Sequence, residues 1–133
     1  MTPQEYIEEQ CALFEKDLSE AGIKQIFSYS ESEISELDNF RQLVYPDGTA
    51  EVENAAAIRW GAAFTKIIAE TWISQWQVDP ESSLPVVVLK CGGRGMQVKS
   101  IVYAAKAFKS GEKFQDVWND LVKTLSEAGA EKA

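Results

Sequence analysis

The stretch Val86–Lys99, VVVLKCGGRGMQVK, decides the fold class of this chain. It begins with three β-branched residues and Leu89, a run typical of a buried strand. Three glycines then surround Arg94, and Met96–Lys99 forms a second short run with strand character. Glycine adopts the positive φ angles that a tight hairpin turn requires. We therefore predict that the two runs pair as a β-hairpin.

The same glycines would also suit a phosphate-binding loop, and the residues around them decide against it. A P-loop has the pattern GxxxxGK[ST], which CGGRGMQVKS lacks. A dinucleotide-binding loop needs a third spaced glycine and a helix directly after it, whereas GGRGMQ leads into a strand. The stretch therefore indicates a turn, with Arg94 at its tip as an exposed residue available to a partner.

A third strand is expected just before this hairpin. Trp76–Asp79, WQVD, has strand character, and the turn residues Pro80–Pro85 separate it from Val86. That connection is too short for a parallel crossover, so the three strands should form an antiparallel meander.

Helical spacing accounts for most of the remaining chain. Helices are predicted at 2–21 (opened by a TPQE capping box), 30–44 (opened by SESE), 49–72, 100–108 and 114–125. Ala55, Ala57, Gly61 and Ala62 are small, so another element is expected to approach the long third helix closely. Ser100 is expected to cap the fourth helix, and the tail after Leu125 to fray. The predicted fold class is α+β in a single domain, 1–133: three N-terminal helices, a small three-stranded antiparallel meander and two C-terminal helices.

The charge is divided unevenly along the chain. The net charge is −8, and residues 1–53 carry thirteen acids against three bases, whereas residues 54–133 carry eight acids and ten bases. An acidic segment of −10 opposes nucleic-acid binding, which usually needs a basic stripe. It either covers solvated helix faces or steers a basic protein partner. A cluster at the second helix, Glu31, Glu33, Glu36 and Asp38, is open to the same two interpretations, because acids near a helix start also favour the helix dipole.

The sequence offers few residues for catalysis or for metal binding. The chain has no histidine, which removes Ser-His-Asp and Cys-His arrangements and every His-ligated metal. Cys11 and Cys91 lie far apart without metal-binding spacing and are expected to be buried, free thiols. An enzyme would have to use carboxylates or Cys91. We therefore expect no catalytic site, metal or cofactor.

Aromatic residues are expected mainly in the core. Trp60, Trp72, Trp76 and Trp118 lie on apolar faces, which favours packing over a ligand cage. Trp76 stands at a strand start, where one edge should be exposed. No run approaches about 18 apolar residues, and the acidic N-terminus lacks the features of a secretory signal, so we expect no membrane partner and a cytoplasmic location.

Residues 55–125 resemble a small uncharacterised bacterial α+β domain family. The likeness lies in the segments AAAIRWGAAFTKII, WQVD, LPVVVLK and AKAFKSGEKFQDVWNDLVKTL. In size, acidity and lack of a catalytic signature, the whole chain also resembles bacterial immunity proteins, which bind and neutralise a toxin domain.

Two functional hypotheses follow, and neither requires enzymatic activity. The leading one is an acidic protein-binding module, an immunity-type inhibitor that neutralises a basic toxin or effector domain. Its predicted partner contacts are Glu31, Glu33, Glu36, Asp38, Trp76 and Arg94. The alternative is a small-ligand-binding or regulatory domain, with a pocket between the meander and the long helix lined by Trp60 or Trp76. The sequence leaves the oligomeric state open.

Overall fold

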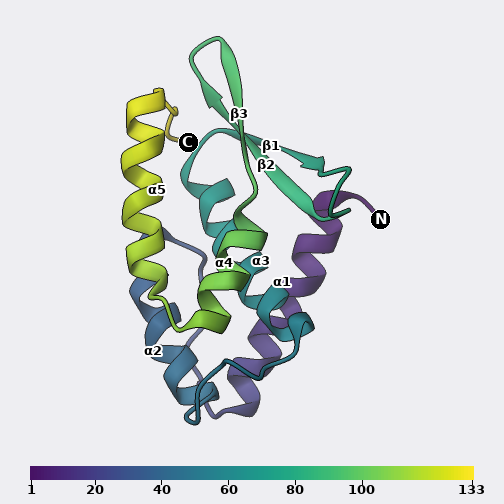
Figure 1. Ribbon diagram of the computed structural model, residues 1–133, viewed down its shortest axis with the longest axis vertical. Coiled ribbons are helices and arrows are strands. Elements are labelled where there is room, and N and C mark those ends of the chain that lie inside the picture. The colour runs from purple at the N-terminus through teal and green to yellow at the C-terminus, as the bar shows by residue number, and fades with distance from the viewer.

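The computed structural model describes all residues, 1–133, and contains five α-helices and one three-stranded sheet. In chain order the elements are α1 (Pro3–Glu20), the short 3₁₀ helix η1 (Glu31–Glu33), α2 (Ile34–Val44), α3 (Asn54–Thr71), β1 (Ser74–Val78), β2 (Pro85–Cys91), β3 (Arg94–Val98), α4 (Ser100–Ser110) and α5 (Phe114–Ala128). The predicted α+β class is confirmed, with the meander between three N-terminal and two C-terminal α-helices. The helices form the body of the molecule, and the β2–β3 hairpin projects beyond them at one end (Figure 1).

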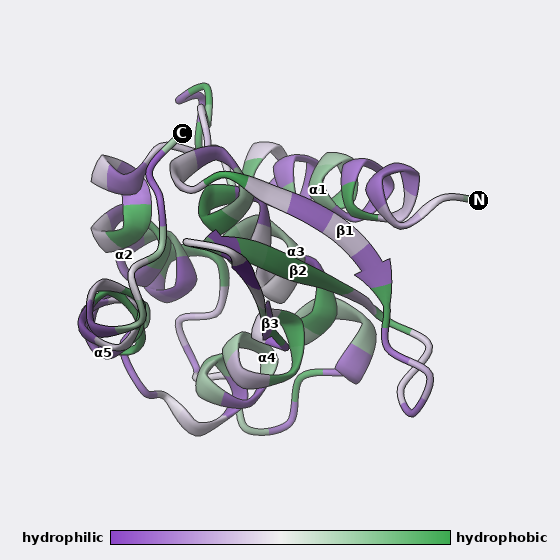
Figure 2. Cartoon of the chain, turned by 90° about the horizontal axis from the view of Figure 1, so that it is seen from above, coloured by the Kyte–Doolittle hydropathy of each residue, from purple (hydrophilic) through white to green (hydrophobic).

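The sheet is the predicted antiparallel meander, with strand order β1-β2-β3. Val87 in the central strand lies opposite Trp76 on one side and Val98 on the other. The hairpin loop is the pair Gly92 and Gly93, and Gly92 has a φ of 64°, which favours glycine at this position. Figure 2 shows β2 as an almost continuously hydrophobic strand, whereas β1 and β3 include polar segments.

The close approach predicted for the long helix occurs at Gly61. A Cβ atom added there would lie 2.8 Å from the backbone oxygen of Ile101 in α4. The same interface buries a pair of hydroxyl groups, since Thr65 Oγ1 lies 2.6 Å from Ser100 Oγ and also donates to the Gly61 carbonyl. Ser100 therefore links two helices from the first turn of α4, and the cap predicted for it is wrong. Helix α3 packs this closely because a glycine stands at the crossing.

Aromatic side chains fill the core around Trp60, which is 0% exposed. Its ring centroid lies 5.0 Å from that of Phe14 and 5.3 Å from that of Phe108. Trp72 and Trp118 are also buried, with ring centroids 5.2 Å apart. The core placement predicted for these three tryptophans is confirmed.

Two predicted boundaries, the start of α3 and the end of β1, are wrong because polar side chains hold the chain in turns. Helix α3 begins at Asn54 and not at Thr49, whose hydroxyl donates a hydrogen bond to the carbonyl of Phe108. Strand β1 begins at Ser74 and excludes Asp79. The Asp79 carboxylate instead accepts hydrogen bonds from the N–H of Glu81 and the hydroxyl of Ser82 in the turn that follows.

The expected fraying of the tail is also wrong at its last residues. Residues 130–132 form bridges to the beginning of β1 and the end of β2, at Trp72 and Cys91. Glu131 accepts from the N–H of Ile73 and donates to the carbonyl of Lys90, both at 2.9 Å. The tail therefore lies where β1 and β2 separate and satisfies backbone groups there.

Candidate interaction surface

Glu33, one of the acids predicted to meet a partner, is only 8% exposed and binds its own segment. Its carboxylate accepts hydrogen bonds from the N–H of Ser28 at 2.9 Å and from the N–H and hydroxyl of Ser30 at 3.3 and 3.1 Å. This is the capping box predicted from SESE. Glu33 thus holds the turn before α2 and presents little charge to solvent.

The carboxylate of Asp38 in α2 also binds groups within the chain, and it connects α2 to the beginning of α5. Its carboxylate accepts from the N–H groups of Phe114 at 2.7 Å and Gln115 at 3.0 Å, and it forms an ion pair with Arg41 at 3.2 Å. Arg41 is buried and also donates to the carbonyl of Glu112 at 2.9 Å. Burial lowers the pKa of the Arg41 guanidinium, and the charge of Asp38 opposes this effect.

The other two predicted acids are more exposed. Glu31 accepts a hydrogen bond from the indole N–H of Trp118 at 3.2 Å and lies 3.6 Å from the Lys132 ammonium group. Glu36 is half-buried and forms no side-chain hydrogen bond or ion pair. The role of these acids in partner binding stays a prediction, whereas the structure shows that three of the four already bind groups within the chain.

Helix α1 presents further acids, which were not among the predicted partner contacts. It carries six acids and one lysine, and its buried side is formed by Ile7, Cys11, Phe14 and Leu18. Glu8 pairs with Lys66 and Asp17 with Arg59. Glu9 and Glu15 are exposed and form no ion pair. The helical period would have indicated these exposed acids, because residues away from the buried stripe of a helix lie at or near the surface.

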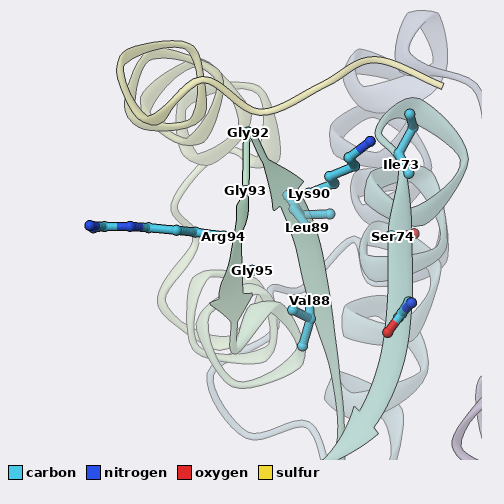
Figure 3. A pocket seen from close by; sticks show the side chains of 10 residues that line it. Ile73, Ser74, Val88, Leu89, Lys90, Gly92, Gly93, Arg94 and Gly95 are labelled. Carbon is cyan, nitrogen blue, oxygen red and sulfur yellow. The ribbon is translucent and has the colours of Figure 1, made fainter.

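Trp76 and Arg94, the two other predicted contacts, lie on the sheet. Trp76 in β1 is half-buried and packs against the edge of the core, in agreement with the expected partial exposure. Arg94 is exposed at the base of the hairpin loop, forms no ion pair, and points away from the sheet (Figure 3). Both side chains are accessible, and their contact with a partner stays a prediction.

A shallow hollow of about 340 Å³ lies on the sheet beside the glycines (Figure 3). Val88, Lys90 and the segment 92–95 line it. A Cβ atom added to Gly95 would lie 2.7 Å from Val88 Cγ1, so this glycine allows the close packing of the two strands. Lys90 pairs with Glu131 at 3.5 Å, and Arg94 points elsewhere. The hollow brings no set of cationic groups together, which agrees with a turn and not a phosphate site.

A more apolar groove of about 390 Å³ lies between β3 and α5. Its lining includes Met96 and Val98 of β3, Tyr103 of α4, and Val117, Asp120 and Leu121 of α5. Tyr103 is 62% exposed, and Asp120 is the one charged residue in the lining. No pattern in the sequence indicates this groove, because its two walls are distant in the chain and meet only through the fold.

The two cysteine side chains differ in their surroundings. Burial raises the pKa of the Cys11 thiol to about 12, and the hydroxyl of Tyr29 donates to the Cys11 carbonyl at 3.4 Å. Cys91 is only half-buried in β2, so the burial predicted for it is wrong, and both thiols are free. No group of three or more acidic or cysteine residues is arranged to hold a metal ion.

None of the helices is both long enough and apolar enough to span a bilayer. The chain matches no protein-family model, no curated protein and no solved structure.

Proposed function

We propose that this chain is a non-enzymatic, acidic protein-binding module of the immunity type, which neutralises a basic toxin or effector domain. The observation that carries the proposal is the exposed, unpaired charge of Glu9 and Glu15 on α1, in a chain of net charge −8. Complementary charge of this kind raises the association rate with a basic partner and selects against acidic ones.

The rigidity of α1 supports its use as a docking face. One side of the helix is buried, and ion pairs from Asp17 to Arg59 and from Glu8 to Lys66 connect it to α3. A surface that is already ordered loses little conformational entropy when it binds, so more of the contact energy contributes to affinity. Tyr6, half-buried on the same helix, offers an aromatic side chain for the desolvated centre of such an interface.

The acids of η1 and α2 divide between two roles in this proposal. Glu31 and Glu36 keep a carboxylate that is exposed or half-exposed and are the further acidic contacts of the proposal. Glu33 and Asp38 already have their hydrogen-bonding capacity occupied, so they position the helices that carry the contacts.

The alternative of a ligand pocket lined by Trp60 or Trp76 has less support. Trp60 is fully buried in the core, and the hollows described above are lined by neither tryptophan. The space between the meander and α3 is filled by side chains of the core.

The test is binding to the purified product of the neighbouring gene, measured by stopped-flow at several salt concentrations. The double variant Glu9→Lys and Glu15→Lys should lower the association rate by about tenfold or more at low salt. The matched control is the double variant Asp116→Lys and Glu127→Lys, which reverses two exposed acids on α5 and should change the rate far less. Absence of binding, or equal rates for both variants, would refute the proposal.

A further inference from the structure

The free edge of β3 forms a second surface, separate from the acidic face of α1. We infer that an extended segment of a partner protein adds to this edge as a fourth strand. Its inward side chains are apolar and enter the groove between β3 and α5, and a basic residue on it meets Asp120. This inference stands on the geometry of β3 and does not depend on docking through α1.

The backbone of β3 supplies the first part of the argument. In a hairpin with a two-residue loop, the flanking pair Cys91 and Arg94 exchanges backbone hydrogen bonds, and every second pair after it does the same. Gly95 and Gln97 therefore direct their N–H and C=O groups away from β2. No other part of the chain forms a backbone hydrogen bond with either residue.

The position of β3 leaves this edge open. It is an outer strand of the sheet, and the hairpin projects beyond the helices (Figure 1). Residues 130–132 pair elsewhere, where β1 and β2 separate, and so do not cover β3. Gly95 and Gln97 thus offer two donors and two acceptors at strand spacing, which is the pattern that an added strand uses.

The groove beside the edge supplies the side-chain specificity. Met96, Val117 and Leu121 are half-buried, and Tyr103 is largely exposed, so apolar surface here lies open to solvent. An added strand points alternate side chains toward this groove, since side chains alternate between the faces of a strand. Because Asp120 is the one charge in the lining, a basic side chain is favoured near it and an acidic one is disfavoured.

A second copy of the chain is a poorer occupant than a foreign segment. Each copy carries a net charge of −8, so two copies repel each other as they approach. A segment with a basic residue is attracted by the same charge.

The probe is a displayed library of random peptides long enough to pair with the whole of β3, selected on the full chain. We expect enriched peptides that alternate apolar residues and include a basic residue. Binding of a labelled enriched peptide is then measured by fluorescence polarisation. The variant Gln97→Pro removes one outward N–H and keeps the β2–β3 ladder, because proline is tolerated on an edge strand when its nitrogen faces solvent. It should weaken binding by at least about tenfold, whereas Gln97→Thr should not.

Three further measurements keep the test independent of how the proline variant folds. Two sets of enriched peptides are compared, methylated at the odd-numbered or at the even-numbered backbone nitrogens. Only the set whose methylated nitrogens face β3 should lose binding, because every second residue of an added strand pairs with its neighbour. Asp120→Lys should weaken binding of basic peptides. The variant with Glu9→Lys and Glu15→Lys should bind the peptide nearly as well as the unmodified chain, which separates this site from the α1 surface.

The inference is overturned if no peptides are enriched, or if enriched peptides bind both Gln97 variants equally. It is also overturned if the two sets of methylated peptides bind with equal affinity. A concentration-dependent dimer in sedimentation that Gln97→Pro abolishes would assign the edge to a second copy of the chain.

Discussion

The carboxylate of Asp38 in α2 caps helix α5 by accepting the N–H of Phe114 at 2.7 Å, from 76 positions earlier in the chain. Helix caps are commonly supplied by the residue just before the helix. Here that residue is Lys113, whose side chain makes no capping hydrogen bond. The first turn of α5 therefore depends on its packing against α2.

Replacement of Asp38 by alanine should destabilise the protein by about 2–4 kcal/mol. It removes the cap of α5 and leaves the buried Arg41 without its ion-pair partner. The measurement is the free energy of unfolding in urea. Glu36→Ala is the control on the same helix, and a change within about 0.5 kcal/mol is expected for it. Equal losses for the two variants would contradict the capping role.

Gly61→Ala should also destabilise the protein, by about 1–3 kcal/mol. Alanine usually stabilises a helix relative to glycine by about 1 kcal/mol, but the added Cβ would lie 2.8 Å from the Ile101 oxygen and force α3 and α4 apart. Thermal unfolding measures the effect. Ala55→Ser, which adds one atom at an exposed position of α3, should change stability only slightly. If Gly61→Ala were more stable than the unmodified protein, α3 and α4 would have separated without a loss of stability, which would contradict the prediction.

Stability should fall at alkaline pH through the thiol of Cys11. Its pKa rises to about 12 in the folded protein because of burial, against about 8.5 in an unfolded chain. Between these values the unfolded state loses a proton that the folded state keeps, so the stability present below pH 8.5 declines toward pH 12. Burial raises the pKa of Tyr29 as well, which adds to the decline at the upper end.

Urea unfolding between pH 8 and pH 10.5 checks this expectation. Cys11→Ala should make the decline with pH less steep. Ile7→Val, a buried truncation on the same helix without a titrating group, should lower stability by a similar amount at every pH. Parallel curves for the unmodified protein and the Cys11 variant would contradict the assignment.

Acrylamide quenching should report mainly on Trp76. Trp60, Trp72 and Trp118 are buried, whereas Trp76 is half-buried on the sheet. The variant Trp76→Phe should lose most of the quenchable fluorescence, and Trp72→Phe should retain it. If quenching persists after Trp76→Phe, one of the core tryptophans is reached by solvent.

The parts of the fold that local chemistry determines were predictable from the sequence. The hairpin follows from a β-branched run and adjacent glycines, and the capping boxes at Thr2 and Ser30 follow from residues three positions apart. The apolar stripe and small residues of α3 predicted its central position and its close contact with another element. In each case the interacting residues are neighbours in sequence or share a face of one helix.

The candidate site was less predictable, because its electrostatics depend on contacts between distant segments. Glu31 and Asp38 look like free acids in the sequence, and only the fold brings Trp118 and Phe114 to them. The tail beyond Gly129 is short and polar, and its pairing partners lie about 40 or more positions earlier. The groove beside β3 likewise exists only after α5 has packed.

The pairing of residues 130–132 between Trp72 and Cys91 has a consequence for synthesis of the chain. During translation the meander emerges from the ribosome before the segment that closes the gap between β1 and β2. Until then, backbone groups of Ile73 and Lys90 are left to water, and the end of the sheet is open to other nascent strands. Chaperone dependence should therefore be greater for chains whose released part ends at Gly129 than for chains in which residues 130–132 have also left the ribosome.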